Sequence, residues 1–230
     1  MGLGFFTTDQ MPDRQAEVSG ELKRQPSWVL RDGLLQRVLG GLDKTASIVD
    51  LGSGSGETER QLLQLGFTNI TTVDIGDYLD FPGKDTAAIK QVRADLSKDV
   101  LDIPAESADV VLALQMLEHL ENPWHCAREI LRIAKPGAII FVSIPDATSF
   151  INRMIYLFRA DVPTYAVKNN HISLFTKALF SKLWGGKVEF KTTFHSEAYF
   201  KLFNRKLRFN GNSWFGRLFA RKVAYCLMRR

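Results

Sequence analysis

The stretch Ser47-Ile48-Val49-Asp50-Leu51-Gly52-Ser53-Gly54-Ser55-Gly56 decides how this 230-residue chain folds. It begins with the short apolar run of a buried strand and ends in three glycines at alternate positions. The periodicity of the next residues predicts a helix over 57–65, closed by Gly66. A glycine-rich turn between a strand and a helix is typical of the first unit of a parallel sheet. Ligands of such sheets bind beyond the carboxyl ends of the strands.

The same alternation of strand and helix continues on both sides of this unit. Upstream, apolar spacing predicts a helix over 28–39 that Gly40 and Gly41 end. Downstream, the predicted strands cover 69–74, 91–94, 108–114 and 138–144, with a helix from Pro123 that Pro136 and Gly137 stop. Beyond them we predict helices over 149–158 and after a cap at Thr176, and strands over 187–194 and 221–228. This order predicts an α/β fold with a doubly wound, mainly parallel sheet of about seven strands.

The chain divides into a loose polar arm over 1–25 and a single domain over 26–230. Within the domain we distinguish a cofactor half (47–146), an insertion (147–186) and C-terminal strands with a basic, aromatic stretch (187–230). Composition is that of an ordinary globular protein, with 45% hydrophobic and 24% charged residues. The beginning has no signal-peptide pattern, no apolar run is long enough to span a bilayer, and two cysteines make no disulfide framework. We therefore expect a cytoplasmic protein.

The net charge of +5 is concentrated at the end of the sequence, because residues 201–230 hold nine basic residues and no acidic ones. Aromatic side chains alternate with these cations. They are compatible with a membrane surface or a lipid-linked substrate, and also with single-stranded nucleic acid. We favour a third interpretation, a hairpin whose aromatics pack on the sheet while the cations stay solvated. The prediction therefore allows peripheral membrane contact through 199–230 and includes no nucleic-acid partner.

The glycine turn itself favours a cationic ligand that bears an adenosine. Its spacing is G-x-G-x-G, and Glu57 stands where a dinucleotide fingerprint has its third glycine. Glu57 and Asp50 would repel a pyrophosphate, and no Gly-Lys-Ser/Thr follows to make a P-loop. Asp74, at the end of the next strand, is placed to accept hydrogen bonds from a ribose diol. A purely structural turn with a capping acid is the alternative.

Several motifs in order resemble those of the class I S-adenosylmethionine-dependent methyltransferases. They are VDLGSGSG at 49–56, VDIG at 73–76, ADL at 94–96 and the segment 106–146 with its LEHL and KPG signatures. HISLFT at 171–176 resembles a later segment of a subgroup that methylates small molecules, quinone precursors and glycans. The resemblance implies a Rossmann-like methyltransferase fold, in which the insertion after the fifth strand forms a lid over the acceptor.

The resemblance also implies a binding site for S-adenosylmethionine. The glycine turn would wrap the methionine portion and the two strand-end acids would hold the ribose and the adenine amino group. Gln115, just past the fourth strand, would close over the cofactor. The implied cofactor-binding residues are Asp50, Gly52, Ser53, Gly54, Gly56, Asp74, Ile75, Asp95, Leu96 and Gln115.

Candidates for the chemistry lie near the acceptor. Methyl transfer to an oxygen with a high pKa needs a base, and an imidazole suits that task. The candidates are His119 in LEHL and His171 in the insertion, with Glu118 to orient either one or bind a metal with it; we assign no metal. Alternatively, Glu118 and His119 order the loop after the fourth strand, and His171 packs within a lid. His125 and His195 are expected to be surface or strand residues.

The predicted function is transfer of a methyl group to an oxygen of a small molecule, a glycan or a lipid-linked precursor. RNA or protein methylation is the second enzymatic hypothesis. Gln115-Met116-Leu117 stands where an Asn-Pro-Pro-Tyr type motif would suit amino-nitrogen acceptors. A non-catalytic cofactor-binding scaffold that acts through its basic tail is the third. The sequence assigns neither the acceptor nor an oligomeric state.

Overall fold

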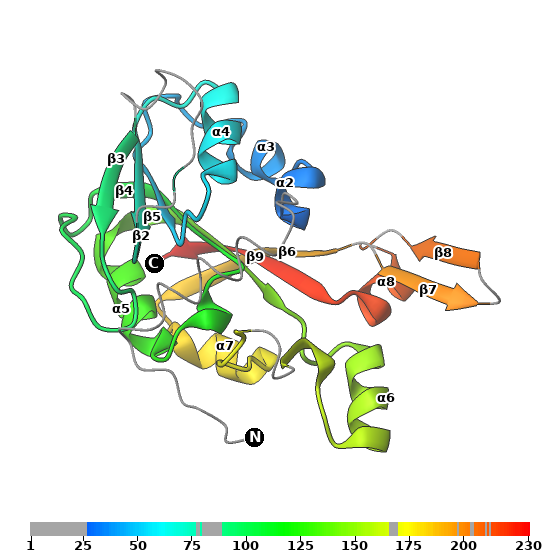
Figure 1. The fold of residues 1–230 in the computed structure, drawn as a ribbon. Coiled ribbons are helices and arrows are strands. Elements are labelled where there is room, and N and C mark those ends of the chain that lie inside the picture. The colour runs from blue at the N-terminus through cyan, green and yellow to red at the C-terminus, as the bar shows by residue number, and fades with distance from the viewer. Residues whose placement is uncertain are drawn as a thin grey trace.

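A seven-stranded sheet forms the centre of the molecule, with strands in the order β3-β2-β1-β4-β5-β9-β6 (Figure 1). The computed structural model describes residues 27–76, 79, 89–165, 170–196, 198–202, 205–209, 211 and 213–230, so the arm predicted over 1–25 lies outside the described residues. The strands are β1 (Ile48–Leu51), β2 (Ile70–Asp74), β3 (Ile89–Arg93), β4 (Ala108–Leu114), β5 (Ala134–Pro145), β6 (Val188–His195) and β9 (Lys222–Arg229).

The sheet is mixed and mainly parallel, as predicted. Strands β3, β2, β1, β4 and β5 run parallel to their neighbours. Strand β9 runs antiparallel between β5 and β6 and pairs with both. The reversal of strand order beside β1 brings the carboxyl ends of β1, β2 and β4 together, which is where ligands of such sheets bind.

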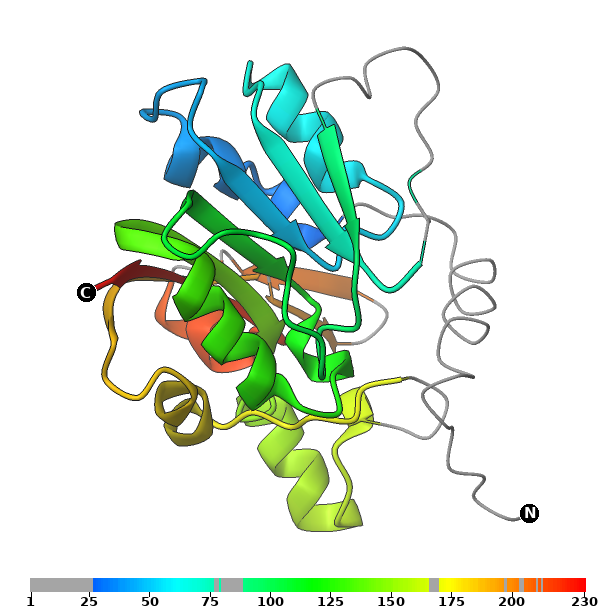
Figure 2. The same ribbon diagram turned by 90° about the vertical axis from the view of Figure 1, so that its left-hand side faces the viewer.

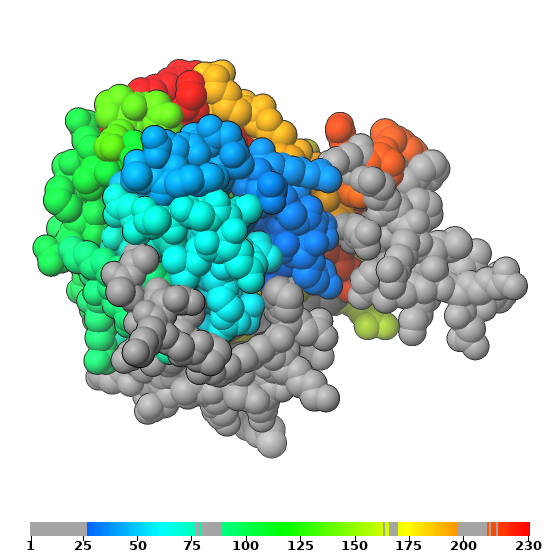
Figure 3. Space-filling view, turned by 90° about the horizontal axis from the view of Figure 1, so that it is seen from above, coloured from blue at the N-terminus to red at the C-terminus, as the bar shows by residue number. Residues whose placement is uncertain are grey.

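Helices cover both faces of the sheet, so its central strands are buried and almost wholly apolar (Figures 1 and 2). On one face lie α2 (Trp28–Arg31), α3 (Leu34–Leu39) and α4 (Glu57–Gln64), which Figure 3 shows side by side. On the other lie α5 (Pro123–Ile133) and α7 (Lys177–Leu183). Successive strand residues point to opposite faces, so Ile48 belongs to the core beneath α2–α4 and Val49 to the core beneath α5 and α7.

Two of the predicted boundaries are wrong. The helix predicted over 28–39 is broken into α2 and α3 at Gly33, whose φ of +64° lies in the left-handed region. The helix from Pro123 ends at Ile133, and β5 begins at Ala134 instead of Ala138. The register with β4 shifts between Ala108 and Val110, so the early part of β5 is an irregular extension.

The insertion and the C-terminal stretch form the periphery of the molecule. The insertion holds α6 (Phe150–Arg159), the 3-10 turn η4 (Pro163–Tyr165) and α7, where Thr176 Oγ1 accepts a hydrogen bond from Leu179 N as the predicted cap. The C-terminal stretch forms a separate hairpin, β7 (Ala198–Leu202) with β8 (Arg205–Phe209), followed by α8 (Trp214–Phe219). Figure 1 shows α6, α8 and the hairpin projecting from one side of the sheet. None of the described helices is long and apolar enough to cross a membrane.

Candidate active site

The glycine turn follows β1 directly and continues into α4. Gly52, Gly54 and Gly56 all have positive φ, at +76°, +52° and +83°. A Cβ atom on Gly52 would lie 2.5 Å from Met116 Cγ, so a side chain at this position would require the Met116 side chain to move. Gly56 caps α4 in the left-handed conformation. The turn is therefore a backbone surface, as the sequence predicts.

Asp74 ties this turn to the end of β2. Its carboxylate accepts hydrogen bonds from Gly54 N at 2.9 Å and from Ile75 N at 2.7 Å, one on each oxygen. Burial raises the pKa of Asp74, and these backbone donors oppose that shift. The structure thus brings Asp74, Ile75 and the glycine turn together, as the resemblance implies. Asp74 lies at the place predicted for the ribose contact, which stays a prediction.

A pair of buried carboxyl groups lies behind the turn, and one of them is absent from the sequence-based prediction. Asp50 in β1 and Glu59 in the first turns of α4 are 2% and 0% exposed and close to each other. Burial and the neighbouring Glu59 raise the pKa of Asp50 well above its ordinary range, and burial raises the pKa of Glu59 to about 7. With Asp74 they place acidic groups around one turn, which favours a cationic ligand.

The segment after β3 forms its own tight turn. Asp95 Oδ1 accepts a hydrogen bond from Ser97 N at 2.9 Å, and Asp95 Oδ2 lies 3.3 Å from Lys98 Nζ. Asp95 N in turn donates to Asp99 Oδ2. The carboxylate thus orders the turn, and Leu96 is buried in the core beside it. The predicted contacts of Asp95 and Leu96 with adenine remain predictions.

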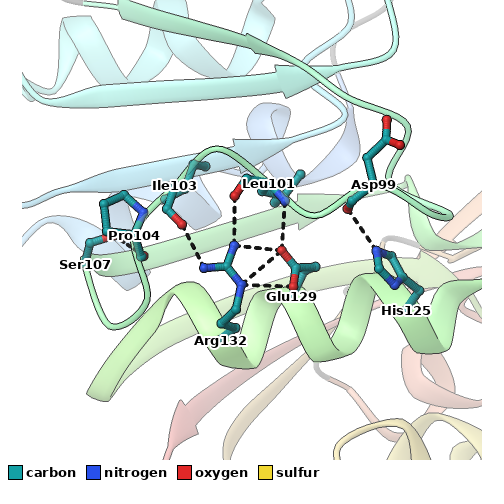
Figure 4. Close-up of polar contacts among 8 residues, drawn as sticks. All are labelled: Asp99, Leu101, Ile103, Pro104, Ser107, His125, Glu129 and Arg132. Atoms are coloured by element: carbon teal, nitrogen blue, oxygen red, sulfur yellow. Dashed lines mark hydrogen bonds and ion pairs between the residues drawn. The ribbon is translucent and has the colours of Figure 1, made fainter.

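A network on α5 holds the chain that leads from this turn to β4 (Figure 4). Arg132 donates hydrogen bonds to Leu101 O at 2.9 Å and to Ile103 O at 2.8 Å. Glu129 accepts from Leu101 N at 2.9 Å and pairs with Arg132 at 2.7 Å. Both side chains point from the helix toward the loop, so α5 fixes the adenine side of the predicted site.

Gln115 lies between the turn and the loop after β4. Its φ is +55°, and its backbone N–H donates to Ser143 O on β5 at 2.9 Å. Its side-chain Nε2 is buried and has no hydrogen-bond partner among the described residues. A buried donor without a partner costs free energy, and a bound ligand would remove that cost. The position is consistent with the predicted role of Gln115 in closing over the cofactor.

Glu118, His119 and His171 meet beyond the carboxyl end of β4. Glu118 and His119 belong to the 3-10 turn η3 (Leu117–His119), and His171 comes from the insertion. Two backbone hydrogen bonds join these segments, from Ile172 N and Ser173 N to Glu118 O, at 2.8 and 3.0 Å. The two imidazole rings lie 4.8 Å apart between centroids. The structure therefore brings together all three residues that the sequence predicts for the chemistry.

Burial sets the protonation of this cluster. It lowers the pKa of His119 to about 4, with a further contribution from His171, and it also lowers the pKa of His171. Burial raises the pKa of Glu118 to about 8. Each group thus favours its uncharged form, whereas an unperturbed imidazole would have a pKa near ~6.5. Of the other histidines, His125 lies on α5, where its ring meets Asp99 O, and His195 ends β6.

Comparisons with known proteins agree with this geometry. A family model described as a methyltransferase domain matches residues 23–191. The ubiquinone biosynthesis O-methyltransferase of Pseudomonas aeruginosa (strain UCBPP-PA14) is 31% identical over 119 residues, which cover 48% of this chain and 47% of that protein. Its counterpart from Caulobacter vibrioides is 28% identical over 123 residues, covering 51% and 46%. The chain thus matches about half the length of these curated relatives.

Solved structures share the fold over almost the whole chain. A chain from the complex between the Haloferax volcanii Trm112 methyltransferase activator and a putative methyltransferase superposes with a TM-score of 0.64, at 15% identity, over 98% of this chain and 99% of that one. An S-adenosylmethionine-dependent methyltransferase from Archaeoglobus fulgidus gives 0.62, at 17% identity, over 93% and 99%. The chain belongs to the methyltransferase-domain family, with the class I Rossmann-like fold and S-adenosylmethionine as its cofactor.

Proposed function

We propose that the protein transfers the methyl group of S-adenosylmethionine to a hydroxyl oxygen of a small molecule, a glycan or a lipid-linked precursor. The observation that carries this proposal is the cluster of Glu118, His119 and His171 at the loop after β4, where Met116 lies against Gly52 of the glycine turn. The names of the curated relatives support an oxygen acceptor, since they are O-methyltransferases of ubiquinone biosynthesis. Hydroxylated quinone precursors are therefore the first acceptors to test.

Positioning supplies most of the catalysis in this proposal. The methyl group moves in line from sulfur to oxygen, and the sulfonium becomes a neutral thioether. Holding two reactants in line is worth about 7–11 kcal/mol in favourable cases. The Gly52–Gly56 turn and Asp74 hold the cofactor, and the insertion over 147–186 acts as the acceptor lid. The hydrogen bonds of Ile172 and Ser173 to Glu118 O support this role, because they fix the lid against the loop after β4.

The cluster receives the acceptor hydroxyl and assists loss of its proton. His119 Nδ1 lies 3.1 Å from Asn170 O, and His171 Nδ1 lies 2.6 Å from Thr164 O. A carbonyl oxygen only accepts, so in each neutral ring Nδ1 carries the hydrogen and Nε2 carries the lone pair. Burial keeps both rings neutral at pH 7, so each Nε2 has a lone pair and no proton there.

The test is methyl transfer from labelled S-adenosylmethionine to a panel of phenols, saccharides, RNA oligomers and peptides. Conversion of the cofactor to S-adenosylhomocysteine with a hydroxylated acceptor, and a product heavier by one methylene, supports the proposal. Turnover only with RNA or peptide establishes the second hypothesis, and cofactor binding without any turnover establishes the scaffold. A His119→Ala variant that binds the cofactor normally and keeps its full rate at every pH removes the cluster from the chemistry.

We also propose that the periphery of the molecule contacts an anionic membrane surface. On α6, Tyr156, Leu157 and Phe158 are 61%, 70% and 81% exposed. A cavity of about 510 Å³ opens between α6, α8 and the sheet, and its lining includes Arg153, Lys177, Arg217 and several aromatic rings. Exposed apolar side chains beside cations match the interface of an anionic bilayer. This surface adds α6 to the stretch 199–230 that the sequence predicts.

A further inference from the structure

We propose that Glu118, His119 and His171 bind one divalent transition-metal ion, with Zn²⁺ as the preferred ion, and that this ion receives the acceptor hydroxyl. The binding of the ion stands on its own, and its role toward the acceptor rests on the proposed function.

The three groups lie close enough together to bind one metal ion after small movements. One ligand atom from each residue can be chosen so that all lie within 4.8 Å of one another. Bonds of about 2.0 Å in tetrahedral geometry put ligand atoms roughly 3.3 Å apart. Closing the triangle to that size moves each group by less than about 1 Å, within the range of small side-chain rotations.

The imidazoles are already oriented as ligands. Each Nδ1 donates to a backbone carbonyl, His119 to Asn170 O and His171 to Thr164 O. A metal-binding histidine characteristically donates its other ring N–H to a carbonyl or carboxylate, which fixes the tautomer and the orientation of the ring.

Glu118 supplies the independent observation. Its side chain is 0% exposed, and neither carboxylate oxygen has a hydrogen-bond partner among the described residues. A buried carboxyl group without a hydrogen-bond partner is costly in either protonation state, and proteins pair such groups or bind them to a metal.

The positive charge of Lys222 disfavours a metal ion bound at the cluster. Lys222, at the start of β9, exerts a charge effect on all three groups of the cluster. Burial lowers the pKa of Lys222, and within the described part of the chain no hydrogen bond or ion pair joins it to Glu118. If Glu118 served only as the counter-ion of Lys222, removing the lysine charge would destabilise the fold. If Glu118 binds a metal, the same change tightens metal binding.

Three protein ligands leave one tetrahedral position open, which is the pattern of catalytic zinc sites. An ion there lowers the pKa of a hydroxyl group that occupies the open position. The hydroxyl proton then passes to solvent, the S–CH₃ bond breaks as the O–CH₃ bond forms, and S-adenosylhomocysteine leaves uncharged. Imidazole ligands favour Zn²⁺ over Mg²⁺, which prefers oxygen ligands.

The experiment titrates tag-free, chelator-treated protein with Zn²⁺ by calorimetry and with Co²⁺ by visible absorption. We expect one ion per chain, with affinity lowered at least tenfold in Glu118→Gln and in His171→Ala and raised in Lys222→Met. His125→Ala is the matched control, since its ring lies on α5 outside the cluster, and should bind as the unmodified protein does. Thermal unfolding of each variant without metal reports whether it folds.

Absence of stoichiometric binding, or equal affinity in Glu118→Gln, His171→Ala and the unmodified protein, overturns the inference. If either variant fails to fold, the Co²⁺ spectrum of the unmodified protein decides, because nitrogen and oxygen ligands in tetrahedral geometry give intense visible bands and hexa-aqua Co²⁺ does not. If chelator-treated protein binds no metal and still transfers the methyl group, this inference is wrong and the proposed function stands. If one ion binds but no hydroxylated acceptor is methylated, the metal site stands and the proposed function is wrong.

Discussion

Backbone conformation and a close contact both restrict Gly52, the first residue after β1. Its φ is +76°, and a Cβ atom would lie 2.5 Å from Met116 Cγ. Alanine would incur about 1–2 kcal/mol for the left-handed backbone and would also displace the Met116 side chain. We expect Gly52→Ala to weaken S-adenosylmethionine binding at least tenfold, measured by calorimetry.

Gly137 provides the control for backbone strain alone. Its φ is +82°, but no atom lies within 4 Å of the position that its Cβ would take. Gly137→Ala should lower the free energy of unfolding by about 1–2 kcal/mol and leave cofactor affinity unchanged. Equal loss of affinity in both variants would contradict the importance of the close approach at Gly52.

The buried Glu59 predicts an unusual dependence of stability on pH. Its pKa in the folded protein is about 7, against 4.5 for an ordinary glutamate. Between these values the folded state holds a proton that the unfolded state has lost, so the free energy of unfolding falls as pH rises. Glu59→Gln removes this loss. Relative to the unmodified protein, we expect the variant to gain about 1–2 kcal/mol between pH 6 and pH 8.5 in urea unfolding.

Glu57 is the matched control on the same helix, because its half-exposed side chain pairs with Arg60 at the surface. Glu57→Gln removes only this surface ion pair and should change the free energy of unfolding by less than about 1 kcal/mol. Parallel curves for Glu59→Gln and the unmodified protein would show that Glu59 is ionised in the fold.

At the scale of elements, α5 determines the conformation of the loop between β3 and β4. Replacing Arg132 removes two hydrogen bonds to the loop and leaves Glu129 with an unpaired charge. We expect Arg132→Met to lower the free energy of unfolding by about 1–3 kcal/mol. Arg128→Met is the control, since Arg128 is exposed on the same helix. Chemical unfolding of both variants measures the difference, and an equal loss in the two would contradict the role of the network.

The strands of this fold were predictable because burial on both faces leaves a clear signal. β4 coincides with the predicted strand at 108–114, and α4 and α7 lie within a residue or two of prediction. The break at Gly33 was not predictable, since the apolar spacing of 28–39 continues through it. The early start of β5 depends on pairing with Ala108, a contact that local sequence does not encode.

The site was predictable to the extent that it lies on consecutive motifs. The turn, Asp74 and Gln115 follow strand ends, so topology alone brings them together. Glu59 escaped prediction, because its burial depends on how α4 packs behind β1, although an acid three residues after Gly56 was a visible signal. The sequence placed both His119 and His171 near the acceptor, but it gave no detail of their contact. Their contact depends on the hydrogen bonds between the insertion and η3.

At the scale of the whole molecule, apolar exposure gathers on the periphery near α6 and α8. Trp214 on α8 is 71% exposed, and Leu157 and Phe158 on α6 are 70% and 81% exposed. We expect the protein to sediment with anionic vesicles at low salt and to be released as salt rises, because screening weakens the attraction. The double variant Leu157→Ser/Phe158→Ser should bind at least fivefold less.

Val100→Ser supplies the control for that experiment. Val100 is 73% exposed but lies in the loop before β4, away from α6. Its variant should sediment as the unmodified protein does. Equal sedimentation of all three proteins, or binding to neutral vesicles alone, would contradict a contact through α6.

The place of β9 within the sheet has a consequence for synthesis on the ribosome. Strand β6 joins the main sheet only through β9 in the described part of the chain, and β9 is translated after β6, the hairpin and α8. A nascent chain that has emerged as far as β6 therefore exposes the outer edge of β5 until β9 has emerged from the ribosome as well. During that interval the edge is open to pairing with other chains, so chaperones that bind extended segments should protect the protein most before β9 has paired with β5.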